Sequence, residues 1–151
     1  MKRDPVVILA EDDDGHAGLI YKGLKRAGVE NDILHFEDGE KTLNYLLRRG
    51  NDFHREESVS HILLLDIHMP GVDGKEVIRQ VKQDKELQNM PIIVVSTTDD
   101  PREKDSCYSL GCSTYIVKPV QHEEFTKVIS QLGHYLLEDV IPKLDSNNAA
   151  N

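Results

Sequence analysis

Carboxylates follow two of the most apolar stretches of the sequence. Glu11 and Asp12 come directly after the run Val6–Ala10, and Asp66 comes directly after the run His61–Leu65. An ionised carboxylate already carries its lone pairs, so it can attack an activated phosphate without a general base. Three such groups in one pocket would repel one another unless a cation balanced their charge. These residue types therefore predict a phosphoryl acceptor beside a Mg²⁺ ion, which prefers one or two carboxylates, retained waters and a phosphate oxygen.

Two further apolar runs also end in polar groups. Ser96 and Thr97 follow Ile92–Val95, and Lys118 follows Ser113–Val117. An ammonium can pair with a carboxylate and later with a phosphoryl oxygen, and a small hydroxyl can reach the same oxygen. The sequence contains neither a phosphate-binding glycine loop nor a Ser/His/Asp hydrolase motif. The phosphate donor would therefore have to bring an activated phosphate of its own.

These runs belong to a regular alternation of five apolar strands with five helices. Apolar runs without polar alternation are typical of parallel strands that are buried on both faces. We therefore predict an α/β fold with a doubly wound five-stranded parallel sheet, for which 2-1-3-4-5 is the leading strand order. In that order the second strand, Asp32–Phe36, lies at the edge, and the four strands with polar ends are neighbours. Their side chains would meet in the crevice beyond the carboxyl ends of the strands, where such proteins bind ligands.

The fourth helix has a clear start but little apolar surface. Asp100, Pro101 and Glu103 have the pattern of a capping box with a proline at the first helical position. The apolar stripe of this helix contains little beyond Cys107 and Leu110. We expect a weakly anchored helix that is able to shift.

The last helix, which begins at about Glu123, has more apolar surface than one stripe requires. Leu137, Val140 and Ile141 extend the stripe, and Pro142 is expected to stop the helix. Because exposed apolar patches tend to mark contacts, we predict a homodimer through this helix and the fifth strand.

Length and composition bound the class of protein. With 151 residues the chain suits one domain, predicted as residues 1–141, followed by a disordered tail over residues 142–151. A net charge of −9 argues against nucleic acid or an anionic membrane as a partner. No run approaches the roughly 18 apolar residues of a membrane span, and no signal peptide is evident, so we expect a cytoplasmic protein. Cys107 and Cys112 lack the spacing of zinc ligands and are expected to be free thiols.

In their order and spacing the motifs resemble the receiver domain of two-component response regulators. The matching elements are EDD after the first strand, DIHMPGVDG after the third, ST after the fourth and YIVKP at the fifth. They cover the chain from about Pro5 to Leu137. The resemblance implies the flavodoxin-like receiver fold and a phosphoacceptor signalling protein that catalyses only its own phosphorylation and dephosphorylation.

The resemblance also implies roles for individual residues. Asp66 would accept phosphate from the phosphohistidine of a sensor histidine kinase. Asp12 would bind Mg²⁺ directly and Glu11 through the outer sphere, with Asp66 and the backbone carbonyl of His68 as further ligands. Lys118 would neutralise charge as phosphate is transferred.

Three more expectations follow from the same resemblance. Ser96 and Tyr115 match the switch pair, in which the hydroxyl moves onto the phosphoryl group and the aromatic ring turns inward. Thr98 and His68 occupy positions at which receivers tune self-dephosphorylation. The Lys118–Pro119 bond is expected to be cis.

Some features look most like the regulators that are paired with bacterial phytochromes. They are the polar loop Gly50–Ser60, the stretches STTDDP and CYSLG, and the long last helix. By composition alone that loop predicts a solvated surface segment, with a loop that contacts a partner as the alternative. No effector domain follows the last helix in this sequence, so the resemblance implies a single-domain regulator whose kinase is a phytochrome.

Two alternatives come from other functional classes. An aspartyl-phosphate phosphatase would want a second acid two residues after its nucleophile, and His68 occupies that position. A degenerate receiver could bind partners without phosphate, but the set Glu11, Asp12, Asp66, Ser96 and Lys118 is complete.

Overall fold

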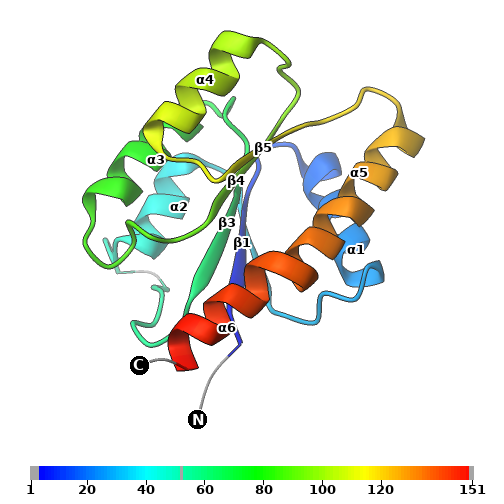
Figure 1. The fold of residues 1–151 in the computed structure, drawn as a ribbon. Coiled ribbons are helices and arrows are strands. Elements are labelled where there is room, and N and C mark those ends of the chain that lie inside the picture. The colour runs from blue at the N-terminus through cyan, green and yellow to red at the C-terminus, as the bar shows by residue number, and fades with distance from the viewer. Residues whose placement is uncertain (1–3, 52, 150–151) are drawn as a thin grey trace.

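A five-stranded parallel sheet forms the centre of the computed structural model, which describes residues 4–51 and 53–149, the last four of them by backbone alone (Figure 1). The strand order is β2-β1-β3-β4-β5, as the sequence predicts. The strands are β1 (Val6–Ala10), β2 (Ile33–Phe36), β3 (His61–Leu65), β4 (Ile92–Ser96) and β5 (Thr114–Val117). Every residue of β3 and β4 is buried, because helices cover both faces of the sheet.

Helices flank the sheet in two layers, with α1 and α5 on one face and α2, α3 and α4 on the other (Figure 1). They are α1 (Asp14–Arg26), α2 (Gly39–Leu46), α3 (Gly74–Gln83), α4 (Pro101–Leu110), α5 (His122–Tyr135), the π-helix η1 (Leu136–Val140) and α6 (Ile141–Ala149). None of the helices in the described ranges combines the length and the apolar character that a membrane crossing needs.

The two helices α1 and α5 are in close contact because glycines face the partner helix. A Cβ atom on Gly23 of α1 would collide with Ile129 of α5, and one on Gly133 of α5 would collide with Ala27. Ile129 itself is buried in the core on this face of the sheet. Helix α5 is therefore tightly packed along much of its length.

Helix α4 is much less firmly held. Cys107 is its one residue classed as buried, and Leu110 packs partly against the core. Asp100 caps the helix by accepting a hydrogen bond from the backbone N–H of Arg102. Weak anchoring of α4 agrees with the prediction from its thin apolar stripe.

The C-terminal segment differs from the prediction that Pro142 stops the last helix. The chain stays helical to Ala149 through η1 and α6, so much of the expected disordered tail over residues 142–151 is helical. Pro142 is the second residue of α6 and follows a π turn, where a missing N–H and a fixed φ are tolerated. Residues 150 and 151 lie outside the described part of the chain.

The apolar excess on this segment is also smaller than predicted. Val140 is buried in the core beneath the sheet, while Leu137 and Ile141 are half-buried against the same core. Part of the surface expected at a dimer contact is thus used within the chain.

The loop Gly50–Ser60 is attached to the body of the molecule rather than fully solvated. Arg55 and Val59 are buried, and the backbone N–H of Arg55 donates to the carbonyl oxygen of Tyr45. Phe53 remains exposed and lies against Tyr45, with ring centroids 5.3 Å apart. The prediction of a solvated segment is wrong for Arg55 and Val59, which are both buried. The partners of Arg55 come from elsewhere in the chain, namely Leu46 and Glu86.

Candidate functional site

The strand register brings the predicted acids together at one edge of the sheet. Strands β1 and β3 pair in parallel, with Ala10 opposite Leu65, so the residues that follow them emerge side by side. One carboxylate oxygen from each of Glu11, Asp12 and Asp66 lies within 4.8 Å of the others. The convergence predicted from the sequence is therefore present in the fold.

Of the five predicted site residues at the strand ends, four are buried and one, Asp12, is exposed. Glu11, Asp66, Ser96 and Lys118 are all at least nine-tenths buried, whereas Asp12 is exposed. Two acids of the cluster, Glu11 and Asp66, are therefore buried, and the third, Asp12, faces solvent. A site of this shape can hold a cation that keeps part of its water shell.

Lys118 is the cation that the structure places at this cluster. Its Nζ donates a hydrogen bond to Glu11 Oε1 and lies 3.5 Å from Asp66 Oδ2. A third neighbour is His16, whose Nδ1 lies 3.2 Å from the same nitrogen. The sequence analysis missed His16; its position in the first turn of the helix after the acidic cluster is the signal that could have found it.

The pKa of Glu11 differs from that of an exposed acid. The pKa of Glu11 is raised from 4.5 to about 8, mainly by burial; the hydrogen bond from Lys118 opposes the rise, and the neighbouring Asp66 adds to it. One ammonium does not balance the carboxylates that converge here. A divalent cation would relieve that imbalance.

The donor set fits magnesium. It consists of hard carboxylate oxygens, Glu11 and Asp66 on the buried side and Asp12 on the solvent side. Mg²⁺ takes oxygen ligands and retains waters, and such a set offers both. The backbone N–H of His68 donates to Asp66 Oδ1 at 3.1 Å, which holds this loop against the acid.

Ser96 and Tyr115 both interact with Thr98. The backbone N–H of Thr98 donates to Ser96 Oγ at 3.3 Å, and the hydroxyl of Tyr115 donates to the carbonyl oxygen of Thr98 at 2.7 Å. The ring of Tyr115 packs against the core on the α4 side, and burial raises its pKa. In this structure the aromatic ring is therefore turned inward.

His68 and Thr98 are joined to each other and to α4. His68 Nε2 lies 2.7 Å from Thr98 Oγ1, and 3.8 Å from Glu103 Oε1. Glu103 also lies 3.6 Å from Lys75 Nζ, at the start of α3. Glu103, which was expected to complete the capping box of α4, thus lies near His68 and Lys75 instead. These polar contacts help to hold α4 in place.

One expectation about the backbone is wrong for this structure. No cis peptide bond occurs among the residues that the structure describes, so the Lys118–Pro119 bond is trans. The trans isomer is the more stable form of an X–Pro bond by about 0.5–1 kcal/mol. In this arrangement Lys118 already contacts Glu11, so the site geometry does not require the cis form.

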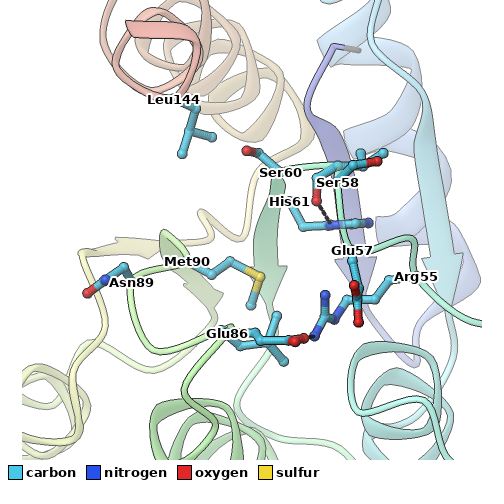
Figure 2. A pocket seen from close by; sticks show the side chains of 11 residues that line it. Arg55, Glu57, Ser58, Ser60, His61, Glu86, Asn89, Met90 and Leu144 are labelled. Carbon is cyan, nitrogen blue, oxygen red and sulfur yellow. Dashed lines mark hydrogen bonds and ion pairs between the residues drawn. The ribbon is translucent and has the colours of Figure 1, made fainter. Parts of the chain in front are cut away.

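A cavity of about 440 Å³ lies away from this site, at the amino end of β3 (Figure 2). Its buried cation is Arg55, which donates from Nε to the carbonyl oxygen of Leu46 at 2.6 Å and from Nη2 to Glu86 at 2.6 Å. His61 forms another part of the wall and accepts a hydrogen bond from the Tyr45 hydroxyl at 2.9 Å. Burial lowers the pKa of His61 to about 4.

The fold and the acidic site together define a receiver-type phosphoacceptor module. The family model described as "Response regulator receiver domain" matches residues 7–130, and this chain belongs to that family. The resemblance stated from the sequence is confirmed.

Curated proteins that are similar to this chain are also response regulators or regulatory proteins. The chain is 32% identical over 136 residues to the probable methanogenesis regulatory protein FilR2 of Methanothrix harundinacea, covering 89% of this chain and 85% of that one. It is 24% identical over 135 residues to response regulator Rcp1 of Synechocystis, covering 89% and 90% of the two chains. A crystal structure of Rcp1 in a Mn²⁺-bound form superposes with a TM-score of 0.80.

A light-signalling regulator is also similar. The structure of a response regulator in red light signaling of R. palustris is 31% identical, has a TM-score of 0.76, and is matched over 89% of this chain and 94% of that chain. The bacteriophytochrome response regulator RtBRR is 32% identical with a TM-score of 0.69, matched over 88% of this chain and 79% of that chain, which confirms the predicted likeness to phytochrome-associated regulators.

Proposed function

We propose that this chain accepts a phosphoryl group from a sensor histidine kinase onto Asp66, in a Mg²⁺-dependent reaction, and that phosphorylation changes its contacts with other proteins. The observation that carries the proposal is the cluster of Glu11, Asp12 and Asp66 oxygens within 4.8 Å, with the Lys118 ammonium 3.5 Å from Asp66. Receiver domains have a histidine kinase as their partner, and this chain is a receiver domain.

The chemistry needs little from the protein beyond position and charge. A lone pair of Asp66 forms the new O–P bond, and the bond from phosphorus to the donor nitrogen breaks with its electron pair leaving on the donor. Asp12 would hold Mg²⁺ directly, with Asp66, Glu11 and the carbonyl oxygen of His68 completing the protein's share. The bound ion would neutralise charge on the phosphoryl oxygens. Lys118 would move from the carboxylates towards one of those oxygens.

The switch that we propose begins at Ser96. Its Oγ accepts from the N–H of Thr98, and a move onto the phosphoryl group would break that bond. Tyr115 is bound to the carbonyl oxygen of the same residue, so the two switch residues share one backbone segment. That segment leads into α4, which is held by few apolar contacts. His68 and Thr98 would set the rate at which the phosphate is lost, because their side chains lie at the edge of the site.

For partners, we propose a phytochrome-type sensor kinase and a second copy of this chain. The likeness to a bacteriophytochrome response regulator and to a regulator in red light signaling supports the choice of this kinase. The dimer would use the last helix and β5, an edge strand whose residues are all half-buried. A cytoplasmic location, as expected from the sequence, belongs to the same proposal.

The experiment is incubation with acetyl phosphate and Mg²⁺, followed by mass analysis of the modified residue. We expect one phosphoryl group on Asp66, no label in Asp66→Asn, and normal labelling in Asp73→Asn, which changes an exposed helix cap on the same stretch. Label on another residue would refute the assignment. Sustained hydrolysis of a small phosphate ester without a kinase would favour the phosphatase alternative.

A further inference from the structure

The Lys118 ammonium has three hydrogens, and three side chains in the described part of the chain lie close to it. One is Glu11 Oε1, one is Asp66 Oδ2 at 3.5 Å, and the third is His16 Nδ1 at 3.2 Å. The Lys118 side chain is only 2% exposed, so its orientation depends on these neighbours rather than on water. Glu11 and Asp66 are carboxylates, which a bound cation would also attract. His16 is the one neighbour among these three that is not a member of the acidic cluster.

His16 lies in the first turn of α1, and its imidazole packs against α5. Its backbone N–H donates to Asp13 Oδ1 at 3.0 Å, which places it in the first turn of α1. Its ring lies edge to face against Phe125 of α5, with centroids 5.4 Å apart and an interplanar angle of 68°. Phe125 is buried, and the His16 side chain is 34% exposed. The ring is therefore a preset acceptor at the rim of the site.

The direction of this hydrogen bond follows from the chemistry of its partners. An ammonium can only donate, so Nδ1 of His16 accepts and the ring hydrogen is on Nε2. The contact carries no opposite charge, unlike the bonds to Glu11 and Asp66. It stays available when those carboxylates turn towards a divalent ion.

We propose that His16 is a positioning residue that keeps Lys118 oriented towards Asp66 while the acids are engaged with Mg²⁺. The inference rests on the proposed function, in which Lys118 neutralises the phosphoryl oxygens as the O–P bond to Asp66 forms. Without His16, the ammonium of Lys118 would lose a neutral hydrogen-bond acceptor that still orients it once Glu11 is engaged with the ion. Such preorganisation matters because a misplaced charge stabilises the transition state less.

The test compares His16→Leu, which removes the acceptor but keeps an apolar contact with Phe125, with His16→Asn, whose amide oxygen can replace Nδ1. With acetyl phosphate at saturating Mg²⁺, we expect His16→Leu to be phosphorylated about tenfold more slowly, in line with losing one hydrogen bond to a charged group. His16→Asn should recover most of the rate. His122→Leu, which removes an exposed imidazole at the start of α5, should leave the rate unchanged.

Two further readouts separate positioning from a loss of structure. Mg²⁺ affinity should be the same in all four proteins. The ammonium signal of Lys118 in nitrogen-detected NMR should be sharp in the wild type and His16→Asn, and broadened by exchange in His16→Leu. A wild-type rate in His16→Leu, or a parallel loss of Mg²⁺ affinity, would overturn the proposal. If wild-type Asp66 takes no phosphate, the proposed function fails, while the Lys118 signal still decides whether His16 holds the ammonium.

Discussion

The two ends of β3 bury polar groups in opposite ways. At the amino end, Arg55 donates to a backbone carbonyl and to Glu86, and His61 is bonded to Tyr45. At the carboxyl end, Glu11 and Asp66 share one ammonium, that of Lys118. The first arrangement satisfies its polar groups within the chain, whereas the second leaves excess negative charge.

The difference separates a structural end from a reactive one. Burying a charge is unfavourable unless it is paired and hydrogen-bonded, so the amino end is arranged for stability. At the carboxyl end the same burial keeps a carboxylate ready for a cation or a phosphoryl group, at the expense of stability without either. Four predictions sharpen this contrast, three on stability and a last one on metal binding.

The largest effect on stability is expected at the amino end. Arg55→Ala leaves the buried carbonyl of Leu46 without its donor and removes the ion pair to Glu86, so the free energy of unfolding should fall by about 2–3 kcal/mol. Chemical denaturation measures this directly. Arg49→Ala, at an exposed position a few residues earlier, is the control and should change stability by less than about 0.5 kcal/mol. Equal effects of the two changes would mean that Arg55 has no special role.

The second prediction concerns pH at the amino end. Burial lowers the pKa of His61 from 6.5 to about 4, so the unfolded chain binds a proton before the folded one does. The contribution of His61 is fully present above pH 6.5 and is lost as the pH falls towards 4, by up to about 1.4 kcal/mol per pH unit. Denaturation across this range should show a shallower dependence in His61→Gln than in the wild type. His134→Gln, an exposed change, should keep the wild-type slope.

The third prediction has the opposite sign, because burial raises the pKa of this group instead of lowering it. Burial raises the pKa of Glu11 from 4.5 to about 8, so its contribution is present below pH 4.5 and is lost as the pH rises to 8. Glu11→Gln should remove this loss when no divalent ion is added. Mg²⁺ favours the ionised acid and should reduce the loss in the wild type. If stability in Mg²⁺-free buffer depends on pH equally in both proteins, Glu11 is not the group responsible.

Much of this contrast could be predicted from the sequence, but not all of it. The run HILLL fixes both ends of β3, and residue types at strand ends identify the acids and Lys118, because parallel strands bring those ends together. Arg55 could not be recognised, since its partners lie 9 and 31 residues away and a polar loop gives no sign of burial. The prediction that Pro142 ends the last helix was wrong. Proline is expected to break a regular α-helix, and here Pro142 follows the π-helix η1. His16 was missed because it lies within α1, whereas the other members of the site follow the ends of strands.

The measurement that tests the central claim most directly is Mg²⁺ affinity by calorimetry in two neighbouring variants. Asp12 belongs to the acidic cluster, whereas Asp13 is the exposed cap of α1 and bonds to the N–H of His16. Asp12→Asn should weaken Mg²⁺ binding at least about tenfold, and Asp13→Asn should leave it nearly unchanged. Equal weakening by both changes would contradict the account, because Mg²⁺ would then be responding to general negative charge rather than to a site built from Glu11, Asp12 and Asp66.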